Sequence, residues 1–136
     1  MTMLTADEIF TKVADALQES CGTAREKITL KAKIIDDLGC DSLDLLDILF
    51  ALEEKFGIKI KRGQIETAAR EGIPEGEFER DGQLTERGAA RMREHMPEVD
   101  TSRITAGMPV GRIPYLFTVE TFCKLVEQKL REKHGG

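Results

Sequence analysis

The chain has 136 residues, enough to bury a core without disulfides or metals, so one compact domain is the expectation. Its net charge of −5, its single tyrosine and its lack of tryptophan argue against a nucleic-acid-binding surface. No stretch approaches the roughly 20 apolar residues of a membrane span, and no basic or apolar leader opens the chain, so we expect a cytoplasmic protein. Three cysteines at unrelated spacings indicate reduced thiols, not a disulfide framework or a metal site.

The first predicted helix spans about residues 6–20. Thr5 and Glu8 have the spacing of a capping box, Gly22 follows the run, and apolar residues recur at helical spacing at Ile9, Val13, Ala16 and Leu17. Between residues 23 and 41 the helical period is lost, although several apolar residues remain. Such a long loop is uncommon in a compact domain, so we expect it to lie pinned across a helical core.

The second predicted helix begins at Asp41 or Ser42 and ends at Gly57. Asp41 is a good N-cap residue, and a glycine is typical after the last helical turn. One wide apolar stripe indicates burial against more than one neighbour: Leu45, Ile48, Leu49, Leu52 and Phe56. The stretch 36–57 carries seven acidic residues against Lys55, which is more than the whole net charge of the protein.

The rest of the chain is mostly predicted to be helical or irregular. Residues 64–70 form a short helix, 72–82 a polar turn region, and 84–95 a further helix with a thin apolar face, in which Gly88 is unfavourable. Pro109, Gly111 and Pro114 predict an irregular segment, and Thr118 caps a last helix from Val119 to about Lys133. No stretch is clearly a strand.

Two segments, one leading into the second predicted helix and one at its end, carry a resemblance to a known family. The run Asp37-Leu38-Gly39-Cys40-Asp41-Ser42-Leu43-Asp44 and the ending Glu53-Glu54-Lys55-Phe56-Gly57 resemble an acyl carrier protein around its phosphopantetheine attachment site. The resemblance implies that Ser42 is esterified by 4'-phosphopantetheine from coenzyme A, with Asp41 and Leu43 as motif neighbours. The thiol of that arm would carry acyl groups as thioesters.

The resemblance covers about residues 5–61 and 113–133, and it implies an all-α fold. We expect an acyl-carrier-like helical bundle of three main helices and a short one, with an extra helical insertion. The predicted organisation is a single carrier domain over 1–136, with its core in 5–62 and 113–133 and the insertion in 63–112. Three interpretations of the insertion remain open: a tolerated surface addition, a lid that enlarges the space for an acyl chain, or a recognition element for a dedicated enzyme. Some specialised carriers have extra residues here, including those that serve very long acyl chains for lipid A.

The acidic residues of the stretch 36–57 predict a docking surface for basic partners. Opposite charges steer association, and acids close to Ser42 do not help to hold a phosphate. The expected docking residues are Asp36, Asp37, Asp44, Asp47, Glu53 and Glu54. The expected partners are a phosphopantetheinyl transferase and acyl synthases or acyltransferases with basic patches. We expect a monomer that neither binds nucleic acid nor inserts into a membrane. Plausible walls for a sheltered acyl chain are Ile48, Leu49, Phe50 and Leu52.

The serine itself does not predict an enzyme. A serine hydroxyl is a weak nucleophile without an adjacent base, no histidine lies near Ser42 in sequence, and the chain has no Gly-x-Ser-x-Gly motif. Cys40 is expected to be a small, partly buried side chain. The predicted function is therefore that of an acyl carrier in fatty acid or lipid biosynthesis. The alternatives are a carrier of aminoacyl or polyketide intermediates and an unmodified helical interaction domain.

Overall fold

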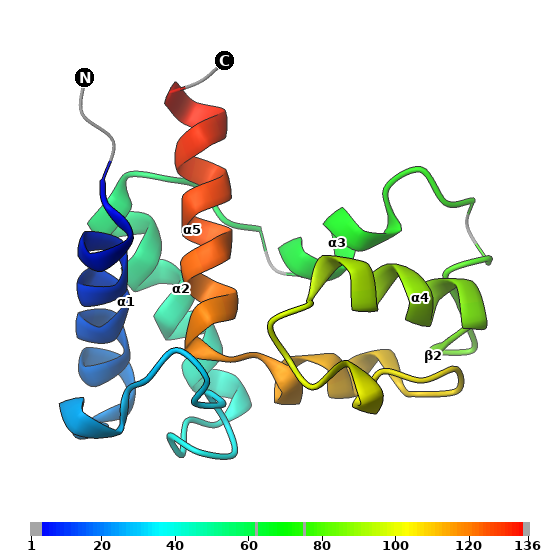
Figure 1. Cartoon of the computed structure of the whole chain (residues 1–136), viewed down its shortest axis with the longest axis horizontal. Helices are drawn as coiled ribbons and strands as arrows, with labels where there is room; N and C mark the ends of the chain where they lie inside the picture. Colours follow the sequence, from blue (N-terminus) through cyan, green and yellow to red (C-terminus); the bar gives the residue numbers. More distant parts are fainter. Residues whose placement is uncertain (1–3, 62, 75, 135–136) are drawn as a thin grey trace. The chain divides into compact units, whose positions relative to one another are not determined.

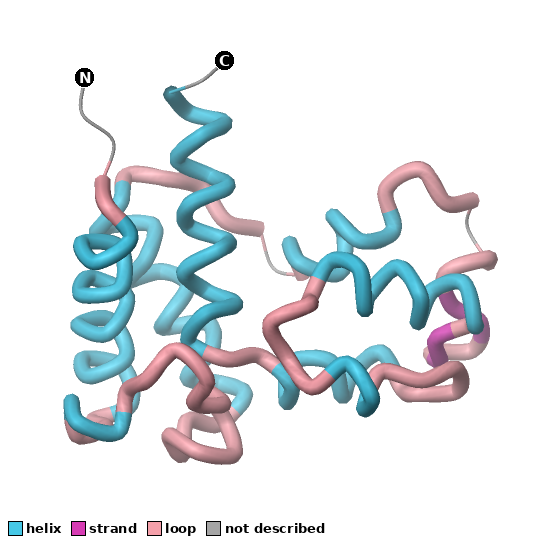
Figure 2. The backbone as a smooth tube through the Cα atoms, viewed as in Figure 1, coloured by secondary structure: helices cyan, strands magenta, loops and turns pink. Residues whose placement is uncertain are grey.

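A computed structural model describes residues 4–61, 63–74 and 76–134 of the chain. The chain divides into two compact units: the bundle unit, residues 1–62 with 117–136, and the inserted unit, residues 63–116. Both are mainly helical, which confirms the predicted all-α fold class (Figures 1 and 2).

The bundle unit is built on three helices that pack against one another: α1 (Ala6–Cys21), α2 (Ser42–Phe56) and α5 (Val119–His134) (Figure 1). Each helix turns an apolar stripe inward because its apolar residues recur every three or four positions. The buried members are Ile9, Val13, Ala16 and Leu17 of α1, Ile48, Leu52 and Phe56 of α2, and Val119, Phe122, Val126 and Leu130 of α5. All three predicted helices are confirmed to within a residue or two at each end.

The ends of these helices are set by local hydrogen bonds. Thr5 and Glu8 form the predicted capping box at α1, with the Thr5 hydroxyl accepting from the Glu8 amide at 3.1 Å. Gly57 ends α2 in the left-handed region, at a φ of 65°. Its amide donates to the carbonyl of Glu53, and its own carbonyl accepts from the Lys133 ammonium group at 2.6 Å. The C-terminal end of α5 is thereby tied to the end of α2.

The long connection between α1 and α2 runs past the start of α5 (Figure 2). It contains one 3₁₀ turn (Arg25–Lys27). The amides of Val119 and Glu120 donate to the carbonyls of Ala32 and Leu30 at 3.0 and 2.9 Å, and the amide of Ile34 donates to the carbonyl of Phe117 at 2.9 Å. The first amides of a helix have no partner within it, so the loop serves α5 as a backbone cap. The expectation of a pinned loop is confirmed.

The prediction of three reduced cysteines is wrong, because Cys21 and Cys40 form a disulfide bond. Spacing along the chain does not report distance in space. The connecting loop brings its end back to the end of α1, so that the two Cα atoms lie 5.5 Å apart. That separation lies inside the range of roughly 4.4–6.8 Å that a disulfide spans. Among the described residues, Cys123 is the free cysteine.

The inserted unit contains two helices, α3 (Gln64–Arg70) and α4 (Glu86–His95), which pack against each other. Both were predicted, and both are confirmed. Two short 3₁₀ helices complete it, Thr101–Arg103 and Val110–Leu116. The second corrects the expectation of an irregular segment, because a proline inside a short 3₁₀ helix removes no more than one amide donor.

A small hairpin was not predicted. Strands β1 (Glu79–Arg80) and β2 (Gln83–Leu84) pair antiparallel across a two-residue turn of Asp81 and Gly82. Both turn residues have positive φ, at 52° and 79°, as a type I′ hairpin turn requires. The expectation of a polar turn region without strands is therefore wrong for this part of the chain.

The apolar side chains of the inserted unit are largely buried, including Phe78, Leu84, Met92, Met96, Val99 and Ile104. Gly88, unfavourable in a helix, is explained by close packing. A Cβ atom at this position would lie 2.0 Å from the carbonyl oxygen of Phe78. Met92 of α4 and Met96, which follows its last residue, are thus core residues of a compact unit.

We expect Ile48→Ala to lower the free energy of unfolding by about 3 kcal/mol, because it leaves a cavity where a fully buried side chain packs. Phe50→Ala on the same helix is the matched control. It should cost less than about 0.5 kcal/mol, because the Phe50 side chain is exposed. Urea unfolding of both variants measures this, and equal losses would contradict the orientation of α2.

Candidate functional site

The candidate site is the start of α2. Asp41 is the N-cap residue, and its carboxylate accepts from the amide of Asp44 at 2.8 Å. The Asp44 carboxylate accepts in return from the amide of Asp41 at 3.0 Å. This reciprocal pair is a capping box made of two aspartates, and it fixes the backbone on both sides of Ser42. The sequence predicted Asp41 as a cap but missed the role of Asp44.

Ser42 is the first residue of α2, and its side chain is exposed. Because Asp41 and Asp44 make the cap, the Ser42 hydroxyl is left outside it. In the described part of the chain this hydroxyl makes no hydrogen bond. It lies at the end of the helix where unpaired amides and the helix dipole favour an anion. An exposed, uncommitted hydroxyl at this place fits the attachment of a phosphate ester.

Two large apolar side chains are exposed on the same helix. Leu43, next to Ser42, is 72% exposed, and Phe50, two turns further on, is 64% exposed. Among the other predicted walls of an acyl shelter, Ile48 and Leu52 are fully buried and Leu49 is half-buried. Phe50 therefore does not line the interior with them in this structure. Its position seven residues after Leu43 places both on one face of α2.

The predicted docking acids fall into two groups. Asp36, Asp47 and Glu54 are exposed. The other three, of which Asp37 is also exposed, hold backbone amides: Asp37 accepts from the amide of Lys33 at 2.8 Å, Glu53 accepts from the amide of Ile60 at 2.7 Å, and Asp44 belongs to the capping box. The first group is free to meet a partner, whereas the second group also stabilises the local fold.

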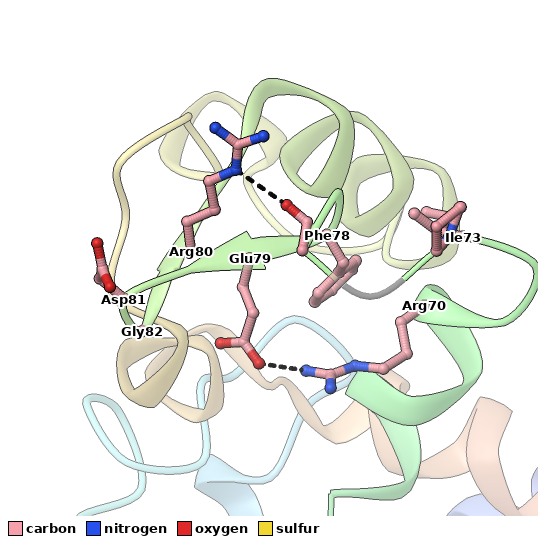
Figure 3. A pocket seen from close by; sticks show the side chains of 9 residues that line it. Arg70, Ile73, Phe78, Glu79, Arg80, Asp81 and Gly82 are labelled. Atoms are coloured by element: carbon pink, nitrogen blue, oxygen red, sulfur yellow. Dashed lines mark hydrogen bonds and ion pairs between the residues drawn. The ribbon is translucent and has the colours of Figure 1, made fainter.

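A pocket of about 760 Å³ lies within the inserted unit (Figure 3). It is lined by residues of the segment 70–82, and sequence reasoning did not anticipate it. Arg70 lies over the ring of Phe78, at 4.9 Å from the ring centre, and pairs with Glu79 at 3.0 Å. Arg80 donates to the carbonyl of Gly76 at 3.1 Å. Both pocket arginines thus already have partners within the unit.

The free thiol of Cys123 is half-buried on α5. Burial raises its pKa to about 12, and the carboxylates of Glu120 and Glu127 add to the rise. Within residues 4–61, 63–74 and 76–134 no group of three or more His, Cys, Asp and Glu side chains could hold a metal ion. Over the same residues, no helix combines the length and the apolar character needed to cross a membrane.

Comparisons with known proteins identify the class to which this helical bundle belongs. A family model described as a phosphopantetheine attachment site matches residues 11–69. An acyl carrier protein of Thermotoga maritima is 40% identical over 70 residues, which is 52% of this chain and 86% of the relative. The acyl carrier protein AcpXL of Brucella melitensis is 47% identical over 70 residues, 51% of this chain and 75% of the relative. A protein of the same name from Rhizobium meliloti is 49% identical over 63 residues, 46% of this chain and 66% of the relative.

The chain belongs to the acyl carrier protein family. It is a carrier, and its cofactor is a covalently bound 4'-phosphopantetheine. Membership also implies interaction with a phosphopantetheinyl transferase and with acyl-handling enzymes.

We expect the alkylation of Cys123 by iodoacetamide to be slow and to speed up about tenfold per pH unit between pH 7 and 10. The thiolate is the reactive form, and a pKa raised to about 12 keeps its fraction small and rising throughout that range. Mass spectrometry of the folded, unmodified protein measures the rate, with circular dichroism to confirm folding at each pH. A rate that levels off near pH 9, as for an ordinary thiol, would contradict the burial of this group.

Proposed function

We propose that the protein carries acyl chains as thioesters on a 4'-phosphopantetheine arm attached to Ser42. One observation carries the assignment to this residue. The two flanking aspartates form the helix cap, which leaves the Ser42 hydroxyl exposed at the positive end of α2. The arm, when bound, supplies the thiol to which acyl groups are attached as thioesters.

The chain presents Ser42 as a substrate for a partner enzyme. The Ser42 oxygen forms the new bond to phosphorus while the pyrophosphate bond of coenzyme A breaks and adenosine 3',5'-bisphosphate leaves, and a base of the transferase accepts the hydroxyl proton. The Asp41 and Asp44 carboxylates accept from the two backbone amides of the cap, and we assign the base to the transferase. The role of the chain is therefore to hold the hydroxyl in place.

Partner enzymes would meet the face of α2 that follows Ser42. Leu43, Asp47, Phe50 and Glu54 are all exposed and follow one another at spacings of four, three and four residues, so they share one side of the helix. The face therefore alternates apolar and acidic side chains. The acidic members favour a partner with a basic patch, and the apolar members supply area to bury. Ile48, Leu49 and Leu52, which face inward, remain the proposed walls of an acyl shelter.

The pathway we propose is fatty acid or lipid biosynthesis, with lipid A as the specialised case. The support is the compact inserted unit, because some specialised carriers also have extra residues in this region, together with the relatives named AcpXL. The cargo would be an acyl chain. Aminoacyl or polyketide thioesters on the purified protein would favour the alternative carriers.

The assignment of Ser42 is tested by incubating the unmodified protein with coenzyme A and a phosphopantetheinyl transferase. We expect the wild-type protein to gain one arm and Ser42→Ala to gain none. Ser102→Ala is the matched control, because Ser102 is also exposed but lies in the inserted unit. Intact mass measures the outcome. An unmodified wild-type protein would indicate an interaction domain, and modification of Ser42→Ala would place the arm elsewhere.

The docking face is tested by charge reversal. Asp47→Lys should lower kcat/KM for arm attachment roughly tenfold or more at low salt, because it places a like charge against a basic partner. Asp15→Lys makes the same charge change at an exposed position on α1 and should have a small effect. The wild-type rate should fall as salt rises, whereas the Asp47→Lys rate should depend less on salt. Equal effects of the two variants would contradict a docking surface on α2.

A further inference from the structure

The disulfide between Cys21 and Cys40 joins the last residue of α1 to the residue before the α2 cap. Cys40 lies two positions before Ser42. Gly22, in the left-handed region at a φ of 68°, ends α1 directly after Cys21 and turns the chain away. The bond therefore ties the segment that leads to Ser42 to a fixed helix end.

The same segment has further anchors that do not depend on the disulfide. The Thr23 hydroxyl donates to the carbonyl of Leu38 at 2.9 Å, and the amide of Cys40 donates to the carbonyl of Ile34 at 3.2 Å. Apolar side chains of the loop are buried as well, among them Ile28, Ile34 and Leu38. Breaking the bond would therefore leave the bundle folded and remove one of several restraints on the segment between residues 36 and 42.

We propose that the Cys21–Cys40 bond is a redox-reversible crosslink that sets how readily Ser42 accepts its phosphopantetheine arm. The inference rests on the proposed function, since it takes Ser42 as the attachment residue. The oxidised form holds the capping box of Asp41 and Asp44 ready for the transferase. In the reduced form part of the population leaves that conformation, and the transferase must order it again on binding.

The redox step exchanges the protein disulfide with two molecules of a low-molecular-weight thiol. The thiolate of the first attacks the Cys21 sulfur, which is half-buried, whereas Cys40 is 1% exposed. The bond between the two protein sulfurs breaks, and Cys40 leaves as a thiolate that takes up a proton. The second thiol then releases Cys21 as a thiol. The products are two protein thiols and one small disulfide, so the two electrons come from the reductant, and the small disulfide drives the reverse reaction.

The experiment compares arm attachment to oxidised and reduced wild-type protein at varied carrier concentration. The redox state is confirmed by alkylation after denaturation, which should add one group to the oxidised form and three to the reduced form. We expect reduction to raise KM about threefold to tenfold with kcat within about twofold, because the fraction of binding-competent protein falls. Cys21→Ser should show the raised KM with or without reductant.

Cys123→Ser is the matched control, because it changes a half-buried cysteine outside the pair. It should keep the wild-type KM and its response to reductant. Because Cys40→Ser places a hydroxyl in a buried position, Cys21→Ser is the variant of choice, with circular dichroism to confirm its fold. If the disulfide had only a structural role, its reduction would change the thermal stability of the protein but leave KM for arm attachment unaltered.

Three results would overturn the inference. The first is equal KM for the oxidised and reduced forms, and the second is a reductant effect that persists in Cys21→Ser. The third is a protein that still takes three alkyl groups after treatment with glutathione disulfide, because the Cys21–Cys40 bond would then not form. Failure of the proposed function would be different, since Ser42 would then remain unmodified in both redox forms.

Discussion

The bundle unit depends on how the α1–α2 loop is bonded to the start of α5. The carbonyls of Leu30 and Ala32 accept from the first amides of α5, and the amide of Ile34 donates to Phe117. These bonds satisfy a helix end that would otherwise be unpaired, and they fix the path of a long loop. The position of Ser42 follows from that path, because the loop ends at the cap of α2.

The residues that cap α2 are different from the residue that offers its hydroxyl, and this separation has a simple physical basis. A serine could cap its own helix, but then its hydroxyl would be committed to a backbone amide. Here Asp41 and Asp44 take over the capping, which frees the hydroxyl and keeps the backbone around it fixed. The exposed Leu43 and Phe50 extend along the same helix. A carrier that meets several enzymes needs a rigid attachment site and an exposed face for docking, and α2 has a fixed start and an exposed face.

Much of this arrangement could be predicted from the sequence. Helices α1, α2 and α5 have strong apolar periods, and Thr5, Asp41 and Thr118 are typical N-cap residues at their starts. The disulfide could not be predicted, since it depends on how the loop returns to α1. The hairpin does have a sequence signal, because Asp81-Gly82 is a common type I′ turn pair. The Asp37 and Glu53 carboxylates accept from backbone amides four and seven residues away in sequence. Charge patterning alone does not show these structural roles.

The central claim is that Ser42 carries the arm, and the most direct measurement is peptide mapping by mass spectrometry of protein purified from the cells that make it. The account predicts that the peptide containing Ser42 bears 4'-phosphopantetheine, in part with an acyl group on its thiol. The mass of that acyl group would also show the cargo. A Ser42 peptide found without the arm under all growth conditions would contradict the account.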